Sequence, residues 1–266
     1  MANDVSRRNE RCLFFHKALA SIGIGSATVD TRLEKDSYRA GEVMQGEIVV
    51  RGGQVEQQVD TIYLSVNTTY IRESNDHKHT EVAALQKVKV TEPFTLGAGE
   101  EKIFPISLTL PFETPISAGK TQVWIQTGLD IKNAVDPSDK DYIRVEPTAL
   151  AGHILDAIRG LGFRLREAEC EQAPSRFRGY YPFVQEFEFV PTGQYRGHLD
   201  ELELVFLSQS NHSAEILMQI DRKVKGIGSF FAEALDMDES YVRTTVTMHD
   251  LPTLQAKLQQ IISKHA

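Results

Sequence analysis

Short runs of alternating apolar and polar residues fill the chain from Ala27 to Val145, and glycine, proline and polar clusters separate them. A period of two is the pattern of strands that bury one face, and it predicts a half built from antiparallel strands. Seven strands at this spacing suit a β-sandwich. The predicted strands are residues 27–33, 43–51, 59–71, 82–92, 101–110, 121–131 and 142–146.

A second region begins near Pro147. Thr148 is a helix-capping residue, and the apolar residues after it recur at helical spacing, which predicts a helix that ends at Gly160 or Gly162. The period of two then resumes and predicts strands at 162–170, 181–189, 199–207, 214–222, 228–235 and 241–248, followed by an amphipathic helix that begins near Asp250.

These patterns predict an all-β protein of two sandwiches with short amino-terminal, interdomain and carboxy-terminal helices. We expect an extension and short helix at 1–23, one sandwich at 24–147, and the interdomain helix, second sandwich and terminal helix at 148–266. In strand 181–189 the phenylalanines alternate with Val184, Glu186 and Glu188, so we expect the aromatic rings inside and the carboxylates in solvent. Lys87 and Lys89 alternate in the same way with Val88 and are expected on an exposed strand.

The charge balance bears on the class of partner. The 266 residues include 29 Lys and Arg and 37 Asp and Glu, a net charge of −8, which disfavours nucleic acid and anionic membranes as partners. The longest apolar runs fall short of the roughly 18 residues of a membrane span. Cys12 and Cys170 stand far apart, without the spacing of a zinc site or a disulfide framework, so we expect a reduced, cytoplasmic protein.

The amino terminus carries a short apolar segment at 13–22 that predicts a helix packed on the body of the protein. His16 and Lys17 interrupt the segment, so it does not match an export signal. The alternative is a peripheral membrane contact through Phe14 and Phe15. We expect no stable membrane insertion, because a segment this short buries little area.

Two clusters have the residue types of metal sites. His77 and His79 would lie on one side of an extended strand, which leaves open a metal-dependent enzyme, but the polar stretch around them favours a solvated loop. Residues 136–141, DPSDKD, lack the spacing of a calcium loop and are interpreted as a connector near the domain boundary. We predict no metal, no cofactor and no catalytic residue, since no nucleophile motif or phosphate-binding loop is present in the sequence.

One loop has the composition of a protein interface. Residues 173–183, APSRFRGYYPF, combine cations with aromatic rings, a mixture enriched where proteins meet. The alternative is that these rings pack under the second sandwich. The candidate protein-binding residues are Arg176, Phe177, Arg178, Tyr180 and Tyr181.

Several segments resemble the SpoOM-type sporulation-control proteins of bacteria, an arrestin-like family. They include VDTRLEKDSYRAGEVMQGEIVVRGG at 29–53, VWIQTGLDIKNAVDPSDKDYIRVEP at 123–147 and GHLDELELVF at 197–206. The resemblance covers most of the chain from Leu13 onward. It implies two arrestin-like sandwiches and a non-catalytic regulatory or adaptor protein that binds other proteins of unknown identity. The terminal helix leaves a homodimer open, because its apolar residues can cover either its own domain or a second copy.

Overall fold

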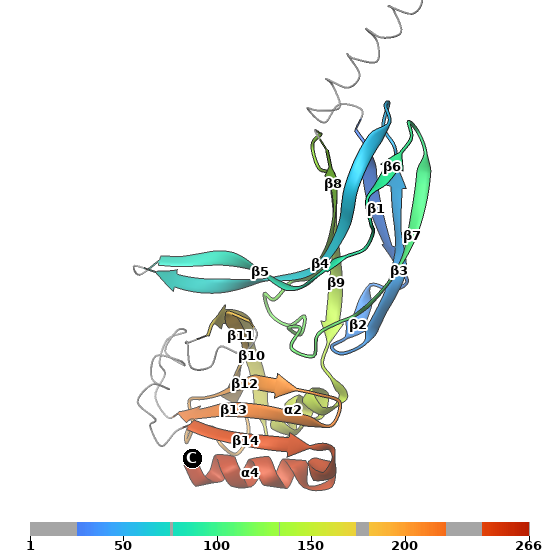
Figure 1. The fold of residues 1–266 in the computed structure, drawn as a ribbon. Helices are drawn as coiled ribbons and strands as arrows, with labels where there is room; N and C mark the ends of the chain where they lie inside the picture. The colour runs from blue at the N-terminus through green and yellow to red at the C-terminus, as the bar shows by residue number, and fades with distance from the viewer. Residues whose placement is uncertain (1–25, 75–76, 133, 174–180, 222–240, 266) are drawn as a thin grey trace, which may run out of the picture.

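The computed structural model describes residues 26–74, 77–132, 134–173, 181–221 and 241–265 (Figure 1). In the first half all seven predicted strands are present, together with two strands of three residues that are too short to show alternation. The strands in chain order are β1 (Thr28–Leu33), β2 (Ser37–Arg39), β3 (Val43–Arg51), β4 (Gln57–Ser74), β5 (His77–Lys89), β6 (Phe94–Leu96), β7 (Glu101–Thr109), β8 (Val123–Ile131) and β9 (Ser138–Glu146).

Two sheets enclose the core of the first half. One contains β1, β3 and β7 in that order, with antiparallel neighbours. The other is built around β4, which pairs with β8 on one side and with β5 on the other, while β9 and β2 continue beyond β8. Alternating apolar side chains from both sheets meet between them, as the period of two predicts. Fully buried members are Met44, Ile48, Ile62, Leu64, Ile125 and Leu129.

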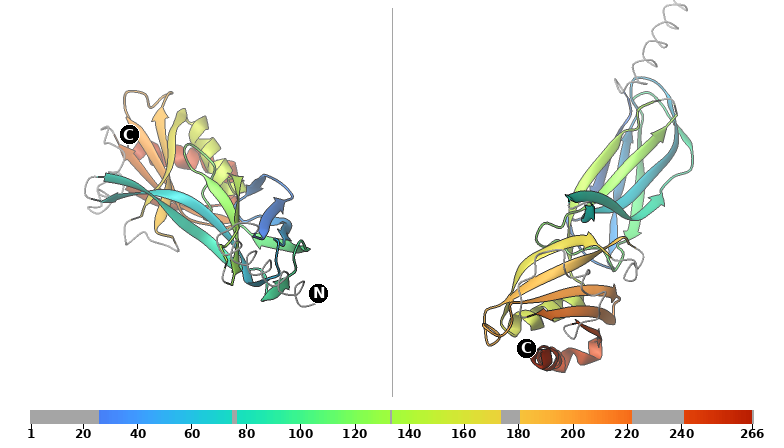
Figure 2. Two further views of the ribbon diagram at one scale, coloured as in Figure 1. Left: turned by 90° about the horizontal axis from the view of Figure 1, so that it is seen from above. Right: turned by 90° about the vertical axis from the view of Figure 1, so that its left-hand side faces the viewer.

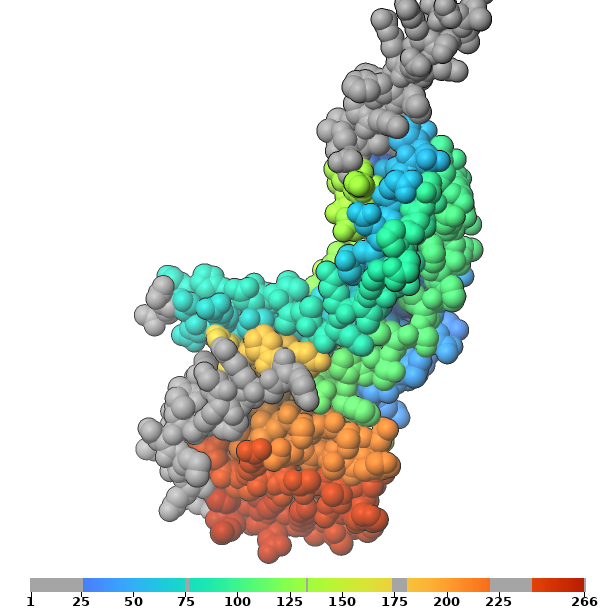
Figure 3. All heavy atoms as spheres, in the orientation of Figure 1, coloured from blue at the N-terminus to red at the C-terminus, as the bar shows by residue number. Residues whose placement is uncertain are grey.

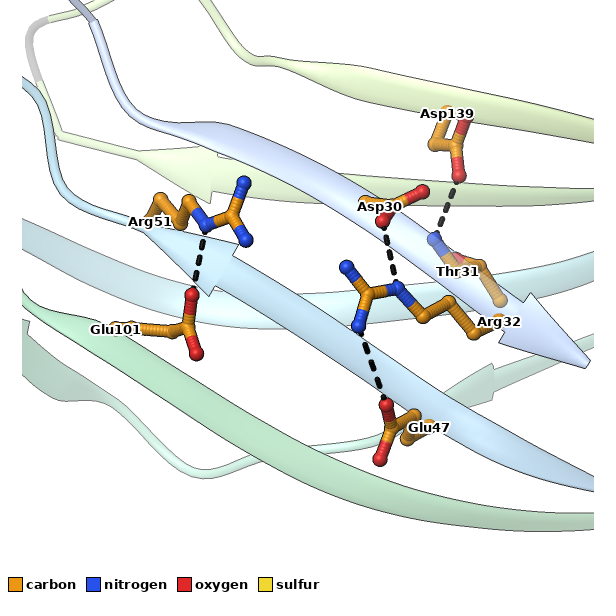
Figure 4. Close-up of polar contacts among 7 residues, drawn as sticks. All are labelled: Asp30, Thr31, Arg32, Glu47, Arg51, Glu101 and Asp139. Atoms are coloured by element: carbon orange, nitrogen blue, oxygen red, sulfur yellow. Dashed lines mark hydrogen bonds and ion pairs between the residues drawn. The ribbon is translucent and has the colours of Figure 1, made fainter.

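Cross-strand ion pairs lie on the outer face of the three-stranded sheet (Figure 4). Arg51 on β3 pairs with Glu101 on β7 at 2.7 Å, and Arg32 on β1 lies 3.6 Å from Glu47 on β3. In each pair the two residues stand directly opposite each other in the register. Because these side chains are exposed, each pair contributes only about 0.2–1 kcal/mol, and this face is stabilised mainly by the core beneath it.

A long hairpin leaves the first half and extends over the second. The register of β4 and β5 shifts between Val66 and Asn67, and beyond this irregularity the hairpin continues to Ser74 and His77. We define the arm as residues 69–74 and 77–82 of this hairpin. The views in Figures 1 and 2 show it crossing over the strands of the second half. A β-bulge bends and twists a ribbon, which accounts for the departure of the arm from the sandwich.

The second half is one antiparallel sheet with helices on its inner face. The order β14, β13, β12, β11, β10 is followed by β4 of the first half, through a parallel pairing of Glu171 with Ile71. One continuous sheet therefore joins the two halves. The elements are α2 (Ala149–Gly160), β10 (Phe163–Gln172), β11 (Phe183–Pro191), β12 (Glu201–Gln209), β13 (Ser213–Asp221), β14 (Tyr241–Thr247), a 3-10 helix (Met248–Thr253) and α4 (Leu254–His265).

The helices form the second layer of this half within the described residues. Thr148 caps α2 as predicted, because its hydroxyl accepts a hydrogen bond from the backbone N–H of Ala151 at 3.1 Å. Leu254, Leu258 and Ile262 of α4 are buried in the same core as the inner face of the sheet. The terminal helix therefore covers its own domain. No helix among the described residues is long and apolar enough to cross a membrane.

Candidate functional site

Of the five candidate residues in the loop predicted to bind partners, only Tyr181 is described. Arg176, Phe177, Arg178 and Tyr180 lie outside the described residues. The Tyr181 hydroxyl donates a hydrogen bond to the carbonyl oxygen of Leu85 on β5 at 3.0 Å, and burial raises the pKa of this half-buried phenol. Its ring stacks on Phe183 with 5.8 Å between the centroids. Tyr181 therefore contributes to the contact between the two halves.

Other side chains strengthen the same contact. The amide of Gln185 on β11 accepts a hydrogen bond from the N–H of Ile116 at 2.8 Å and donates one to the carbonyl of Ile116 at 2.7 Å. Gly119 has a φ of +59°, and a Cβ there would lie 2.3 Å from the carbonyl oxygen of Ala168. Only glycine allows this approach of the segment before β8 to β10. The orientation of the first half relative to the second half is therefore fixed by specific contacts.

The carboxylates of β11 differ from the sequence expectation. Glu188 is only 7% exposed, and Arg166 on β10 forms an ion pair with it and another with Glu201 at 2.7 Å. Burial raises the pKa of Glu186 well above its ordinary value, and the charge of Glu171 adds to the effect. The prediction of aromatic rings inside and acids in solvent is correct for the rings and wrong for these acids. Carboxylates gathered on adjacent strands shield one another from water, which single-strand alternation does not reveal.

His77 and His79 are in strand β5 at the outer end of the arm, where the sequence favoured a loop. Both side chains are exposed, and they share one side of the strand as an extended backbone requires. Within the described residues, no group of three or more His, Cys, Asp or Glu side chains is arranged to hold a metal ion. The structure thus provides no third ligand for this pair among those residues.

The DPSDKD segment belongs to the first half and is not an interdomain connector. It runs from the turn after β8 into β9, and in that turn Asp136 accepts a hydrogen bond from the N–H of Ile131 at 2.9 Å. Asp139 accepts one from the N–H of Thr31 at 2.7 Å and so ties β1 to the opposing sheet (Figure 4). Burial, with the neighbouring charge of Asp139, raises the pKa of Asp141 to about 6.

A broad surface lies on the outer side of β5, β4, β8 and β9, next to the arm. The register places its residues in three rows across these strands, and we call them together the concave face. From β5 to β9 the rows are Lys89, Tyr63, Gly128 and Ser138; Lys87, Ser65, Gln126 and Lys140; and Ala84, Asn67, Trp124 and Tyr142.

The arm continues this surface at an angle. Tyr70 stacks on Phe183 of the second half, with 5.7 Å between the centroids, so the opposite face of the arm looks away from the second half. Val82 lies on that opposite face, because it pairs with Thr69 in the register, and it is 62% exposed. Figure 3 shows the arm and the sandwich meeting at a hollowed corner. The concave face and the outward side of the arm line this corner.

Cations on the concave face lie over aromatic rings. The ammonium of Lys140 is 4.0 Å from the centroid of Trp124 and 4.6 Å from that of Tyr142, and that of Lys87 is 4.4 Å from the centroid of Tyr63. Trp124 is 4% exposed, and its indole N–H donates a hydrogen bond to the side-chain oxygen of Gln126 at 3.4 Å. A lysine side chain held over a fixed ring samples fewer rotamers. These ammonium groups are therefore already positioned before a partner binds.

The sequence shows part of this surface. Tyr63 and Ser65 alternate with the buried Ile62 and Leu64, so their exposure follows from the period of two. The pairing of β8 with β4 and β9 does not follow from that pattern, and this pairing brings Lys140 into one row with Lys87.

The fold and this surface define the class of protein. It is an all-β protein of two linked halves, with a hairpin arm and a broad exposed sheet face. The chain belongs to the SpoOM protein family, whose model matches residues 15–224. It is 44% identical to the sporulation-control protein spo0M of Bacillus subtilis (strain 168) over 257 residues, which are 95% of this chain and 99% of that protein. The resemblance predicted from the sequence is confirmed.

A solved structure supports the same assignment. The crystal structure of Spo0M, a sporulation control protein from Bacillus subtilis, matches this chain with a TM-score of 0.86 and 43% sequence identity. The match covers 91% of this chain and 100% of that one. The fold is therefore that of the family across nearly the whole chain.

Proposed function

We propose that this member of the SpoOM family is a regulatory protein that acts by binding another protein and not by catalysis. Its similarity to a sporulation-control protein of Bacillus subtilis supports the regulatory role. The observation that carries the binding mechanism is the arm, whose β5 residues from His77 to Val82 are all exposed. The other side of the arm already packs on the second half through Tyr70 and Phe183, so this exposed side is the one left for a partner to cover.

The composition of the corner favours a protein as the partner. Tyr142 is 57% exposed and Val82 is 62% exposed, and lysines and amide side chains lie between them. Aromatic and apolar side chains surrounded by polar groups are typical of the centre and rim of protein interfaces. The stacking of Tyr70 on Phe183 holds the arm on the second half, and the hydrogen bonds between Gln185 and Ile116 hold the second half on the first, so the corner keeps one shape and less entropy is lost when a partner binds.

The proposal also covers the location of the protein in the cell and the classes of cofactor and partner that it does not bind. We place the protein in the cytoplasm, without a cofactor, a nucleic-acid partner or stable membrane insertion. The net charge of −8 supports this, because it opposes binding to nucleic acid and anionic lipid. The polar groups of the concave face support a non-catalytic role, since Asn67 donates to Ser65 at 3.0 Å and Trp124 to Gln126, so these groups satisfy one another.

The test is affinity capture from the native cytoplasm with the full chain as bait, followed by mass spectrometry. The test variant combines Val82→Asp with Tyr142→Ser. The matched control combines Ile103→Asp with Val43→Ser, because these side chains are 52% and 48% exposed on the other sheet of the first half. A third variant, Arg176→Glu, tests the loop predicted from the sequence and leaves Tyr181 in place because it joins the halves.

We expect the control to retain a specific partner that the test variant loses, with equal thermal unfolding midpoints for both. If the test variant retains the partner and Arg176→Glu loses it, the binding site lies on the second half and the corner is not the binding surface. Absence of any specific partner for the unmodified chain would overturn the proposed function. Light scattering of the purified chain shows whether the partner is a second copy.

A further inference from the structure

The concave face differs in charge from the rest of the chain. The protein carries 37 Asp and Glu in 266 residues, yet the twelve positions of the three rows contain three lysines and no carboxylate. Lys89 forms an ion pair with Glu92 at 2.7 Å. Lys87 and Lys140 lie over aromatic rings instead, and within the described residues neither ammonium has a carboxylate within 4.0 Å. Two fixed positive charges therefore remain available on an acidic protein.

The middle row sets the distance between these charges. Lys87, Ser65, Gln126 and Lys140 stand side by side on four neighbouring strands. Neighbouring strands are about 4.8 Å apart, so the two lysine backbones are about 14 Å apart. An extended peptide advances about 3.3 Å per residue, so side chains four residues apart span about 13 Å. Two carboxylates at that spacing match the separation of the two lysine backbones.

Gly128 leaves room beside the row that carries the two lysines. It lies on β8 in the row next to Lys87 and Lys140, and a Cβ built there would meet no atom within 4 Å. Tyr63 stands beside it on β4. A glycine inside a strand weakens the strand and often marks a place where another backbone approaches. No described residue of the chain fills that space.

We propose that the concave face binds an extended acidic segment of the partner protein, with two carboxylates four residues apart on Lys87 and Lys140 and the segment backbone passing over Gly128. This inference rests on the proposed function and names the chemistry of the partner. The cation–ring contacts hold the two ammonium groups in place, and the polar side chains of Ser65 and Gln126 separate the two lysines in the row. Charge complementarity of this kind determines which partner binds and how fast it associates.

The probe is a dye-labelled peptide of nine serine and threonine residues in which glutamates replace the third and seventh positions. The matched peptide carries glutamines there. Binding of both to the full chain is measured by fluorescence anisotropy at low and at physiological salt. We expect the glutamate peptide to bind about fivefold or more tightly at low salt, with a smaller ratio at physiological salt because of screening.

Three variants locate the binding. Lys87→Gln combined with Lys140→Gln should abolish the preference for glutamate. Lys264→Gln, which removes an exposed cation from α4, should retain it. Gly128→Ala should weaken binding of the glutamate peptide about fivefold without lowering the thermal unfolding midpoint, because its methyl group would have no neighbour within 4 Å among the described residues.

Equal affinity for the two peptides, or failure of both to bind at millimolar concentration, would overturn the inference. A preference that survives loss of both lysines would overturn it as well. These outcomes are separate from those of the capture experiment. If a partner is captured but the two peptides bind equally well, the proposal of an acidic segment is refuted and the proposed function stands. If the glutamate peptide is clearly preferred but no partner is captured, the proposed function is refuted and only the charge complementarity of the face is supported.

Discussion

Replacing Asp141 with asparagine should stabilise the protein at neutral pH. Asp141 lies on β9 opposite the buried Ile125, and one of its carboxylate oxygens is buried without a hydrogen-bond partner among the described residues. Burial, then the charge of Asp139 and a hydrogen bond with it, raises the pKa of Asp141 from 3.8 to about 6. The charge of Asp30 acts in the same direction.

The sign of the pH dependence follows from this direction. The folded state holds the Asp141 proton up to a pH of about 6, whereas the unfolded chain releases it near 3.8. Stability from this group is therefore present at low pH and is lost as the pH rises from about 4 to 6. A shift of about 2 pKa units corresponds to about 3 kcal/mol as an upper bound. Because Asp141 is only partly buried, solvent screening reduces the expected loss to about 1–2 kcal/mol.

The assay is urea unfolding of the wild type and Asp141→Asn at half-unit steps from pH 4 to pH 8. We expect the two free energies of unfolding to coincide near pH 4 and the variant to be more stable by about 1–2 kcal/mol above pH 7. Asp130→Asn, at the exposed end of β8, serves as the control for removing a negative charge. A variant that is less stable than the wild type at pH 8, or a gain equal to that of the control, would refute the reasoning.

Three further substitutions test the contact between the halves and the start of α2. Gln185→Met should lower the free energy of unfolding by about 2–3 kcal/mol, measured in urea, because both backbone groups of Ile116 lose their partner. Gly119→Ala should cost about 1–3 kcal/mol and lower the thermal midpoint, since its Cβ would overlap the carbonyl of Ala168; an unchanged midpoint would contradict the close approach. Thr148→Ala should cost about 1 kcal/mol through loss of the helix cap, whereas Thr148→Ser should retain most of it in the same assay.

The sequence predicted the sandwich strands and the capped helix because a single periodicity governs each of them. It failed at the arm for a physical reason. Residues 72–74 and 77–82 are exposed, so no alternation of apolar and polar residues records which face they present. The same segment therefore resembled a polar loop. The part of the hairpin that leaves the sandwich was the part least visible in the pattern.

The candidate site could be predicted only in fragments. The outward position of Tyr63 follows from its neighbours in the sequence, whereas the row that joins Lys87 to Lys140 depends on the pairing of four strands that are distant in the sequence. Composition drew attention to the loop containing Tyr181, but the hydrogen bond from Tyr181 to Leu85 places that ring between the halves. Residue types indicate interface chemistry, and only the register shows which of them share a surface.

Photo-crosslinking inside the cell tests most directly whether the concave face meets a protein. A photoreactive amino acid replaces Ala84, which is exposed in the third row of the concave face. The control carries it at Ile103, which is 52% exposed on the opposite sheet. We predict a discrete crosslinked protein at position 84 that is absent at position 103 and is lost when Lys87 and Lys140 are also replaced. Adducts at position 103 alone, or none at position 84, would contradict the account.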